Sequence, residues 1–292
     1  MKTLLLTTLG LLFANLMFAG QVNEPIVQVY LVKGDVTLID TSNNQTRPLQ
    51  RGDLISEGYA VETGANSSAL LLFSNGSSIN VTPESYLDIS EFSQEPFEMS
   101  VRNYAQLSED PSASNTSLDL HYGKVVGNVR KLNSESSYVI NSPTGSAGIR
   151  GTTFVFATLS KDDAAAASSD QLSSSIAVLA VGEGQVIITV NGVETVVNEG
   201  ESVQIPVTFR DGGVGILEIE SVGSANVGSL TPEQQQLLAD NNQAIADAAA
   251  DAFLLSPGGE AGPDTVTPLR VQDDPTNFDN LGPTLNVTNT PS

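Results

Sequence analysis

The chain has a single histidine, and it lies two residues after an aspartate. His121 and Asp119 fall on the same face of a strand predicted within residues 118–130, so His121 is a candidate general base. A Ser-His-Asp arrangement needs the carboxylate behind the ring and a hydroxyl in front of it. Neighbours on one strand face lie side by side, and no Gly-x-Ser-x-Gly turn is present. We therefore interpret His121 as a surface residue of a strand rather than a catalytic one.

Carboxylates are abundant, with 34 Asp and Glu residues. A pair of them could hydrolyse a glycoside, but so many candidates single out no pair. Asp273, Asp274, Asn277 and Asp279 resemble a loose oxygen cage for calcium, yet the glycine and the bidentate glutamate of an EF-hand loop are missing. We interpret them as part of a solvated acidic tail. The sequence predicts no catalytic residue, no metal site and no cofactor.

The charge balance narrows the choice of partners. The formal net charge is -22, with only twelve Lys and Arg residues, so the chain is not expected to bind nucleic acid and anionic membrane surfaces should repel it. Cysteine is absent, which excludes disulfides, thiol nucleophiles and thiolate metal sites. A hydrophobic fraction of 40% is compatible with a packed core.

The segment 142–156, SPTGSAGIRGTTFVF, combines strand formers with three glycines and an arginine. Residues 152–156 are β-branched or aromatic and predict a buried strand. Arg150 has small or apolar neighbours, so its guanidinium would need carboxylate or carbonyl partners if it were buried. We predict a structural corner held by Arg150, with a ligand-anchoring arginine as the alternative. On the structural interpretation, Arg150→Ala should destabilise the fold.

The same segment resembles a family signature. Its pattern P-T-x-x-x-G-I-R-G-T-x-F is similar to the signature of the FecR domain family, with Thr152 and Phe154 at the family's threonine and aromatic positions. The residues that carry this part of the resemblance are Pro143, Thr144, Gly148, Arg150, Gly151, Thr152 and Phe154. Further similar residues are Gly34-Asp35-Val36, Pro48-Leu49, Arg51-Gly52-Asp53, Thr63-Gly64, Leu70–Phe73, Asn75-Gly76-Ser77 and Gly182-Glu183-Gly184-Gln185-Val186. The resemblance spans roughly Val29 to Ile205.

The resemblance implies a non-catalytic extracytoplasmic β domain. In the family member that gives the family its name, the periplasmic domain receives a signal from an outer-membrane receptor, and a cytoplasmic part across one membrane helix acts on a sigma factor. This sequence shows no such cytoplasmic part. The resemblance therefore implies the extracytoplasmic domain alone, periplasmic or secreted, as a unit that binds a protein or glycan of a bacterial envelope.

Alternating apolar residues and glycine-containing turns predict a mainly β fold, an antiparallel sandwich or roll. We expect a hairpin over 26–39, a second hairpin around Asn75-Gly76, and short strands over residues 176–207. Two stretches look alike: Gly34-Asp35-Val36 followed by Gly52-Asp53, and Gly184-Gln185-Val186 followed by Gly200-Glu201. They suggest two related β layers folded on each other.

The ends of the chain differ from this β pattern. Residues 1–20 read as a secretory signal peptide, which would leave no stable membrane insertion after cleavage. The β domain is expected over 21–222 and a helical segment over 223–257, whose helix runs from the cap Thr231 to Leu255 and carries a capping box with Gln234. Residues 258–292 read as a disordered acidic tail.

Three functional hypotheses remain open. The first is the FecR-type binding and signalling module described above. The second is a structural or adhesion protein of the envelope, in which the helix and the tail mediate assembly. The third is a carboxylate-based glycan hydrolase, which would need two carboxyl groups at catalytic spacing in a cleft.

Overall fold

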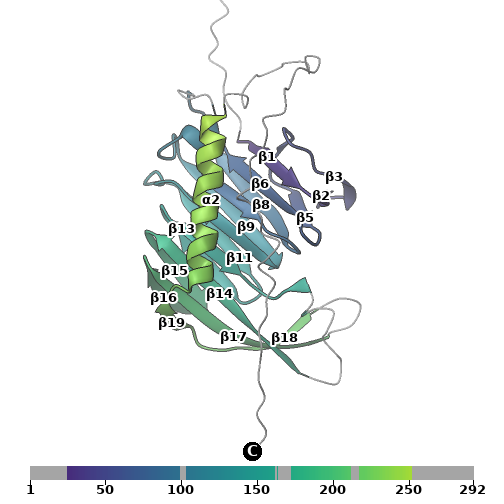
Figure 1. Cartoon of the computed structure of the whole chain (residues 1–292), viewed down its shortest axis with the longest axis vertical. Helices are drawn as coiled ribbons and strands as arrows, with labels where there is room; N and C mark the ends of the chain where they lie inside the picture. The colour runs from purple at the N-terminus through teal and green to yellow at the C-terminus, as the bar shows by residue number, and fades with distance from the viewer. Residues whose placement is uncertain (1–24, 99–102, 162, 164–171, 212–216, 252–292) are drawn as a thin grey trace, which may run out of the picture.

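The computed structural model describes residues 25–98, 103–161, 163, 172–211 and 217–251. Two sheets face each other and one helix lies against the first of them (Figure 1). The predicted fold class is therefore confirmed. None of the helices in the described part of the chain is both long enough and apolar enough to span a membrane. The predicted signal peptide and the predicted tail lie outside the described residues.

Sheet A has the strand order β18-β17-β14-β13-β10-β7-β6-β1-β4, with β19 also paired to β17. Its strands are β1 (Val27–Lys33), β4 (Leu54–Ile55), β6 (Ser68–Phe73), β7 (Ser78–Val81), β10 (Lys124–Asn128), β13 (Thr153–Ala157), β14 (Ser173–Glu183), β17 (Glu201–Asp211), β18 (Leu217–Val222) and β19 (Asn226–Ser229). All of their pairings are antiparallel.

Sheet B has the order β16-β15-β12-β11-β9-β8-β5-β2-β3. Its strands are β2 (Val36–Asp40), β3 (Gln45–Pro48), β5 (Tyr59–Thr63), β8 (Tyr86–Gln94), β9 (Ser114–Tyr122), β11 (Ser137–Ser142), β12 (Gly145–Ile149), β15 (Gln185–Val190) and β16 (Val193–Asn198). The pair β9–β11 is parallel and the other pairs are antiparallel.

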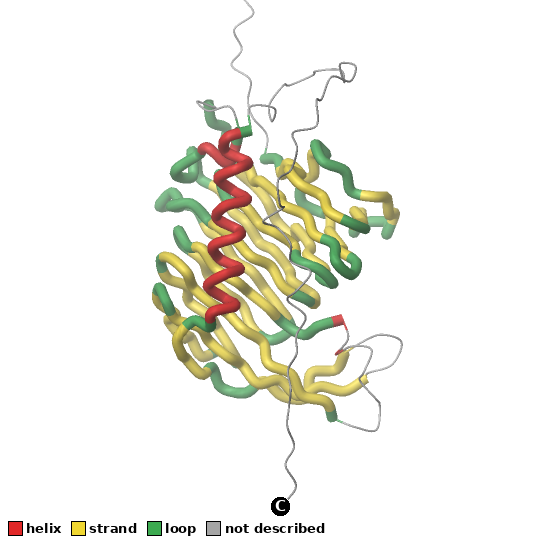
Figure 2. The backbone as a smooth tube through the Cα atoms, viewed as in Figure 1, coloured by secondary structure: helices red, strands yellow, loops and turns green. Residues whose placement is uncertain are grey.

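The core lies between the two sheets, where their apolar faces meet. Phe73 of β6 in sheet A and Phe92 of β8 in sheet B illustrate this contact, because their rings meet edge to face with centroids 5.1 Å apart. The strand over 153–157 is buried, as its composition predicted: Phe154 and Phe156 are fully enclosed. Figure 2 shows that most of the described backbone is strand, with one long helix alongside.

The predicted hairpin over 26–39 is wrong, because β1 and β2 do not pair. β1 belongs to sheet A and β2 to sheet B, so the Gly34-Asp35 turn carries the chain from one sheet to the other. Gly34 has φ +69°, and a Cβ atom there would come within 2.4 Å of Ser67 Oγ, which accepts a hydrogen bond from the Asp35 amide. The turn is therefore a tight corner for which only glycine fits.

The predicted hairpin at Asn75-Gly76 is confirmed, since β6 and β7 pair across it. Only Gly76 has a positive φ, and the buried Asn75 side chain accepts hydrogen bonds from the amide and the hydroxyl of Ser77. Asn75 Nδ2 also contacts the hydroxyls of Ser114 and Thr116 on β9, at 3.3 and 3.2 Å. This turn therefore links the two sheets as well as closing a hairpin.

The two similar stretches of sequence form equivalent hairpins, but they do not form two layers. β2–β3 and β15–β16 both lie in sheet B, at its opposite ends, and each is preceded and followed by a strand of sheet A. The expectation of two related layers is therefore wrong. Local turn-and-strand patterns specify the hairpins, whereas long-range pairing decides which sheet receives them.

The C-terminal helix α2 (Pro232–Ala250) begins as the sequence predicts, with Thr231 as N-cap and a complete capping box with Gln234. Leu237 and Leu238 pack on Val126, Val155 and Ala180 of sheet A. Nearer its C-terminus, Ile245 and Ala248 join a second apolar cluster, whose other buried members are Leu70, Leu72, Phe97, Tyr104, Ala105 and Leu107. This cluster includes the short 3-10 helix η1 (Tyr104–Gln106). α2 therefore covers the outer face of sheet A.

The segment before α2 holds a strand that the sequence analysis missed. β19 lies within the region predicted as helical, and it pairs with the first half of β17. Its four residues are all exposed, so they lack the apolar alternation that identifies a strand. The predicted helix extension over 252–255 lies outside the described residues.

Candidate functional site

The outer face of sheet B is the surface on which the residues of interest meet. We call it the open face and define it by the outward side chains of β5, β8, β9, β11, β12, β15 and β16. Along β15, Val186, Ile188 and Val190 are buried, while Gln185 and Ile187 are exposed. This alternation is typical of a sheet with one face on the core and one face in solvent.

The signature segment is divided between the core and the open face. Thr144, Thr152 and Phe154 are buried, whereas Gly148 and Arg150 are exposed. Pro143 is exposed at the turn between β11 and β12. Thr144 lies in that turn, where its hydroxyl is 2.9 Å from Ser142 Oγ. Only half of the signature therefore has a structural role that burial explains.

Arg150 does not hold the corner, and this part of the sequence interpretation is wrong. Its side chain is exposed, and within the described residues no hydrogen bond or ion pair fixes it. The corner is held by Thr152, whose backbone exchanges two hydrogen bonds of 2.9 Å with Val129 and whose hydroxyl donates to the Gln185 carbonyl at 3.0 Å. An exposed guanidinium needs no protein partner because water solvates it.

Two glycines of the resemblance meet at this corner. Gly184 has φ +79°, and a Cβ atom on it would lie 2.4 Å from the Gly151 carbonyl oxygen and 3.1 Å from Thr152 Oγ1. The backbone at Gly151, just before β13, therefore lies directly against the backbone of the β14–β15 turn at Gly184. Thr152, Gly151 and Gly184 therefore hold this corner together.

We expect the two residues of this corner to differ in their effect on stability. Arg150→Ala should change the free energy of unfolding by no more than about 0.5 kcal/mol, as for most surface substitutions. Thr152→Val, which keeps the shape but leaves the Gln185 carbonyl without its donor, should cost about 1–2 kcal/mol. Urea denaturation of the two variants measures both. A larger loss for Arg150→Ala would restore the structural interpretation of that arginine.

Two further glycines of the resemblance, Gly34 and Gly52, lie in the turns before β2 and after β3, at the opposite edge of sheet B. Asp53 accepts a hydrogen bond from Arg47 at 2.6 Å and another from the Gln50 amide at 3.0 Å. The Gly52 amide donates to the Val29 carbonyl, and the Asp53 carbonyl accepts from the Val29 amide. Together with Gly34 and Asp35, these residues fix the turns around β2 and β3. The structure does not bring them together with Arg150.

His121 and Asp119 lie on β9 in the middle of the open face. His121 is exposed, as expected for a surface residue of a strand, and its ring meets that of Tyr86 edge to face at 4.9 Å. Asp119 accepts a hydrogen bond from Asn141 Nδ2 at 2.8 Å. The side chain held against Asp119 is therefore the Asn141 amide rather than the imidazole, so the pair lacks the order of a catalytic triad.

Sequence reasoning missed the residue opposite Asp119. In the antiparallel pair β8–β9, Asp88 is the register partner of Asp119, so two carboxylates lie side by side across the strands. One oxygen of Asp88, Oδ1, is buried without a hydrogen-bond partner. Burial, and next the charge of Asp119, raise the pKa of Asp88, while the nearby His121 acts in the opposite direction. The strand over 86–89 was predicted, but its pairing with β9 across a long loop was not.

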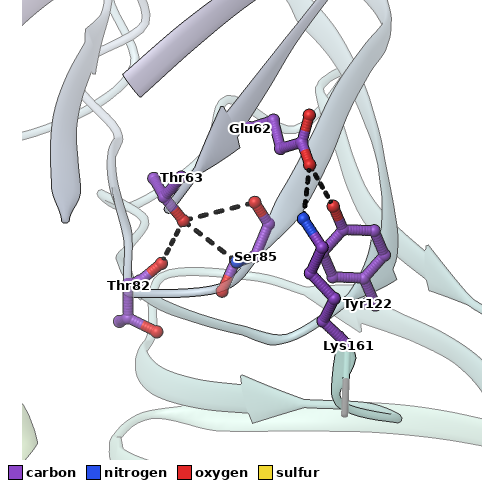
Figure 3. A network of polar contacts seen from close by, with 6 residues as sticks. All are labelled: Glu62, Thr63, Thr82, Ser85, Tyr122 and Lys161. Atoms are coloured by element: carbon purple, nitrogen blue, oxygen red, sulfur yellow. Dashed lines mark hydrogen bonds and ion pairs between the residues drawn. The ribbon is translucent and has the colours of Figure 1, made fainter. Parts of the chain in front are cut away.

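A third carboxylate on this face, that of Glu62, is neutralised within the fold. Figure 3 shows the Tyr122 hydroxyl and the Lys161 ammonium both directed at Glu62, and both contact its Oε1, at 2.6 and 3.0 Å. The hydrogen bond from Tyr122, followed by Lys161, lowers the pKa of Glu62, although partial burial opposes this. Lys161 also lies over the Tyr122 ring at 5.7 Å. Asp88 and Asp119 are left as the cross-strand pair of like charges.

The neighbouring contacts in Figure 3 explain Thr63 of the resemblance. Its buried hydroxyl donates to the Thr82 carbonyl at 2.6 Å and accepts from the Ser85 amide at 2.9 Å. Thr63 therefore fixes the connection between β7 and β8 to the end of β5. This role is structural, because the side chain is only 1% exposed.

We expect Asp88→Asn to stabilise the protein at neutral pH. The pKa of Asp88 is higher in the folded state than in the unfolded chain, so its protonated form contributes stability that is fully present below the unfolded value and is lost as the pH rises through the folded value. Asparagine removes this loss, and the gain should be on the order of 0.5 kcal/mol, typical of relieving a cross-strand pair of like charges.

Thermal melting of both proteins between about pH 3 and pH 7 measures this effect. The difference should shrink as the pH falls. A difference that does not depend on pH, or a loss of stability at neutral pH, would show that the two carboxylates do not repel each other.

Within the described residues, no group of three or more His, Asp and Glu side chains is arranged to hold a metal ion. The loose oxygen cage of Asp273, Asp274, Asn277 and Asp279 lies outside them.

Comparison with known proteins confirms the resemblance. Residues 59–186 match the model of the FecR family, described as "FecR protein", so this part of the chain is similar to FecR proteins. The matched segment is shorter than the span of roughly Val29 to Ile205 that the motifs suggested. It contains the signature with Arg150, and also Asp88, Asp119 and Gly184.

Among solved structures, the chain is similar to two crystal structures of a candidate anti-sigma factor from Parabacteroides distasonis ATCC 8503, at 1.65 and 2.50 Å resolution. Both are 8% identical, with a TM-score of 0.38, and the match covers 62% of this chain. It spans 63% and 62% of the two relatives, which is less than two thirds of their length. A search of the curated proteins found no match.

Proposed function

We propose that this chain is a non-catalytic, extracytoplasmic FecR-type domain that binds a protein or glycan partner of a bacterial envelope in a signalling role. The observation that carries the proposal is the position of Arg150. This residue belongs to the signature, lies inside the segment that matches the family, and is nonetheless exposed directly after β12, without a structural partner among the described residues. A signature residue that the fold does not need is a candidate for binding, because guanidinium groups recognise carboxylates and other anions well.

The surroundings of Arg150 support contact over a surface. β12, β15 and β16 present the exposed Gly148, Ile187 and Val196 beside it. Ile187 and Val196 are directly opposite each other and are 42% and 46% exposed. Large apolar side chains exposed next to a charged group are typical of interaction surfaces.

A pull-down from bacterial envelope extract tests the proposal. The chain itself, Arg150→Gln and the control Arg210→Gln would be immobilised in equal amounts. Both substitutions remove one positive charge, but Arg210 lies on β17 of sheet A, where it pairs with Glu218 and Glu220. We expect the unchanged chain and Arg210→Gln to retain the same partner, and Arg150→Gln to retain at least about tenfold less of it, since a desolvated charged hydrogen bond contributes about 1.5–3 kcal/mol. Equal retention by all three would remove Arg150 from the binding surface.

The glycan hydrolase remains a second candidate because of one observation. Asp88 has a raised pKa and lies opposite a second carboxylate, Asp119, which is the combination a general acid and its partner need. Incubation of purified glycan strands with the unchanged chain and with Asp119→Asn would distinguish the hydrolase from the binding module. Release of reducing ends by the unchanged chain alone would favour the enzyme over the binding module.

A further inference from the structure

The β16 edge of sheet B differs from the β3 edge of the same sheet and from the edge strands β4 and β18 of sheet A. At the opposite edge, β3 carries Pro48, which has no N–H group, and Arg47, which pairs with Asp53. In sheet A, β4 is only two residues long, and β18 carries Glu218 and Glu220. Such features protect an edge from pairing with another chain. β16 has a single charged residue, Glu194, and its Val193 and Val196 are 65% and 46% exposed.

The contrast is informative because β2–β3 and β15–β16 are equivalent hairpins of the same sheet. One is protected and the other is not. Within the described residues, β15 is the only strand that pairs with β16. An edge of six residues with exposed valines is long enough and apolar enough to accept a further strand.

The hairpin geometry identifies which backbone groups are available. Asn191 and Gly192, with φ 51° and 77°, form a two-residue loop, so the flanking pair Val190 and Val193 exchanges both hydrogen bonds. Along β16, residues whose N–H and C=O groups bond to β15 alternate with residues whose groups point away from it. The groups that point away from β15 are those of Glu194, Val196 and Asn198. The Asn198 amide instead donates to Glu201 Oε2 at 2.8 Å. Glu194 and Val196 therefore offer the edge for pairing.

The side chains around this edge define the chemistry of an added strand. Val196 lies beside its register partner Ile187 on the open face, and the two form an apolar row. On the other side of Ile187, its partner Gly148 has no side chain, so the Ile187 side chain is left uncovered there. Glu194 lies two residues before Val196 on the same face, and Glu199 is exposed just beyond the strand. An incoming strand would fit with an apolar residue opposite Val196 and a basic residue opposite Glu194.

We propose that the β16 edge accepts, as an additional antiparallel strand, an extended segment of a partner protein in which an apolar residue and a basic residue lie two positions apart, on the same face of the strand. This inference rests on the proposed binding function and names the surface and the class of partner. Charge complementarity selects this occupant over a second copy of the chain, because two molecules of net charge -22 repel each other.

Peptide binding tests the proposal directly. The probe is a fluorescein-labelled decapeptide, capped at both ends, in which every second residue is threonine and the residues between are valine and lysine in turn, so that valine and lysine share one face of the strand. A second peptide of the same sequence carries N-methyl groups on alternate residues, so that it keeps the charge but cannot add as a strand. A third peptide carries glutamate in place of each lysine. We expect the chain to bind the first peptide at least tenfold more tightly than the other two, measured by fluorescence anisotropy at physiological salt.

Variants of the chain locate the site. Val196→Pro removes an N–H group that points away from the ladder, so the β15–β16 pairing should remain while the first peptide binds at least tenfold more weakly. Val196→Lys keeps the backbone intact and should repel the same peptide. Glu194→Lys should weaken binding more than its control Glu218→Lys, which makes the same change of charge on β18 of sheet A. If Val196→Pro fails to fold, Val196→Lys and the N-methylated peptide still show whether the first peptide adds as a strand at the β16 edge.

Four outcomes would overturn the proposal. Equal binding of the methylated and unmethylated peptides would indicate charge attraction without strand addition. Binding of the first peptide that neither Val196 variant weakens would place it elsewhere. Self-association of the chain in sedimentation that Val196→Lys abolishes, without peptide binding, would make the occupant a second copy.

If the envelope partner is retained equally by the unchanged chain and by both Val196 variants, the proposed function stands and only the edge is excluded. If the unchanged chain retains no partner, the proposed function itself fails.

Discussion

Gly184→Ala should destabilise the protein by about 3 kcal/mol or more, enough to remove a large part of the stability of an ordinary domain. Two costs combine at this position. The residue has φ +79°, which alanine adopts only with strain, and its Cβ atom would lie 2.4 Å from the Gly151 carbonyl oxygen. The obstacle is backbone rather than a flexible side chain, so relief requires movement of the corner that holds β13 against β15.

Gly200→Ala is a matched control for this substitution. Gly200 has the same φ of +79°, but a Cβ atom there would meet nothing within 4 Å. It should therefore cost only the conformational strain, on the order of 1 kcal/mol. Urea denaturation of both variants separates the two contributions. Equal losses would show that the contact between Gly184 and Gly151 adds nothing beyond backbone conformation.

Phe154→Ala should cost about 3–5 kcal/mol, as expected for an aromatic ring removed from a packed core. The ring is fully buried and lies over Gly127, its register partner on β10. A Cβ atom on Gly127 would come within 2.2 Å of the Phe154 ring. Gly127→Ala alone should therefore also destabilise, by about 1–3 kcal/mol from overpacking.

The double variant gives the decisive measurement. With the ring of Phe154 absent, the methyl group of Gly127→Ala enters the space that the ring occupied, and the two losses should not add. We expect the double variant to be at least about 1 kcal/mol more stable than the sum of the single effects, a coupling normal for residues in direct contact. Denaturant titration of the four proteins completes the cycle. Strict additivity would mean that the ring does not rest on the glycine.

Much of the fold could be predicted from local patterns. The turn at Asn75-Gly76, the buried strand over 153–157 and the cap at Thr231 each depend on residues close in sequence, so single-sequence reasoning identified them. The assignment of strands to sheets depends on pairings between distant residues. For this reason the hairpin over 26–39 was predicted where the chain instead changes sheets, and β19 was missed because its exposed residues show no alternation.

The candidate site was less predictable than the fold. Small and apolar neighbours suggested that Arg150 is buried, but only Ile149, the last residue of β12, is buried, while Gly148 and Arg150 on either side of it are exposed. The partner of Asp119 could not be found without the pairing of β8 with β9. Asn141, Tyr86 and Asp88 come to Asp119 and His121 from two other strands, and no spacing along the sequence reports that proximity.

The attachment of α2 also implies that the protein resists mechanical force differently at its two ends. The last turn of the helix is held by Asn103, which donates to the carbonyls of Ala248 and Asp251, and by the ion pair of Arg51 with Asp251 at 2.7 Å. A pull at residue 251 would break these few contacts first and then peel the helix away turn by turn. A pull at residue 25 would load β1 along its length, shearing its ladders with β4 and β6 together. Tension from the C-terminal side would therefore bare the outer apolar surface of sheet A while the sandwich beneath it stays folded.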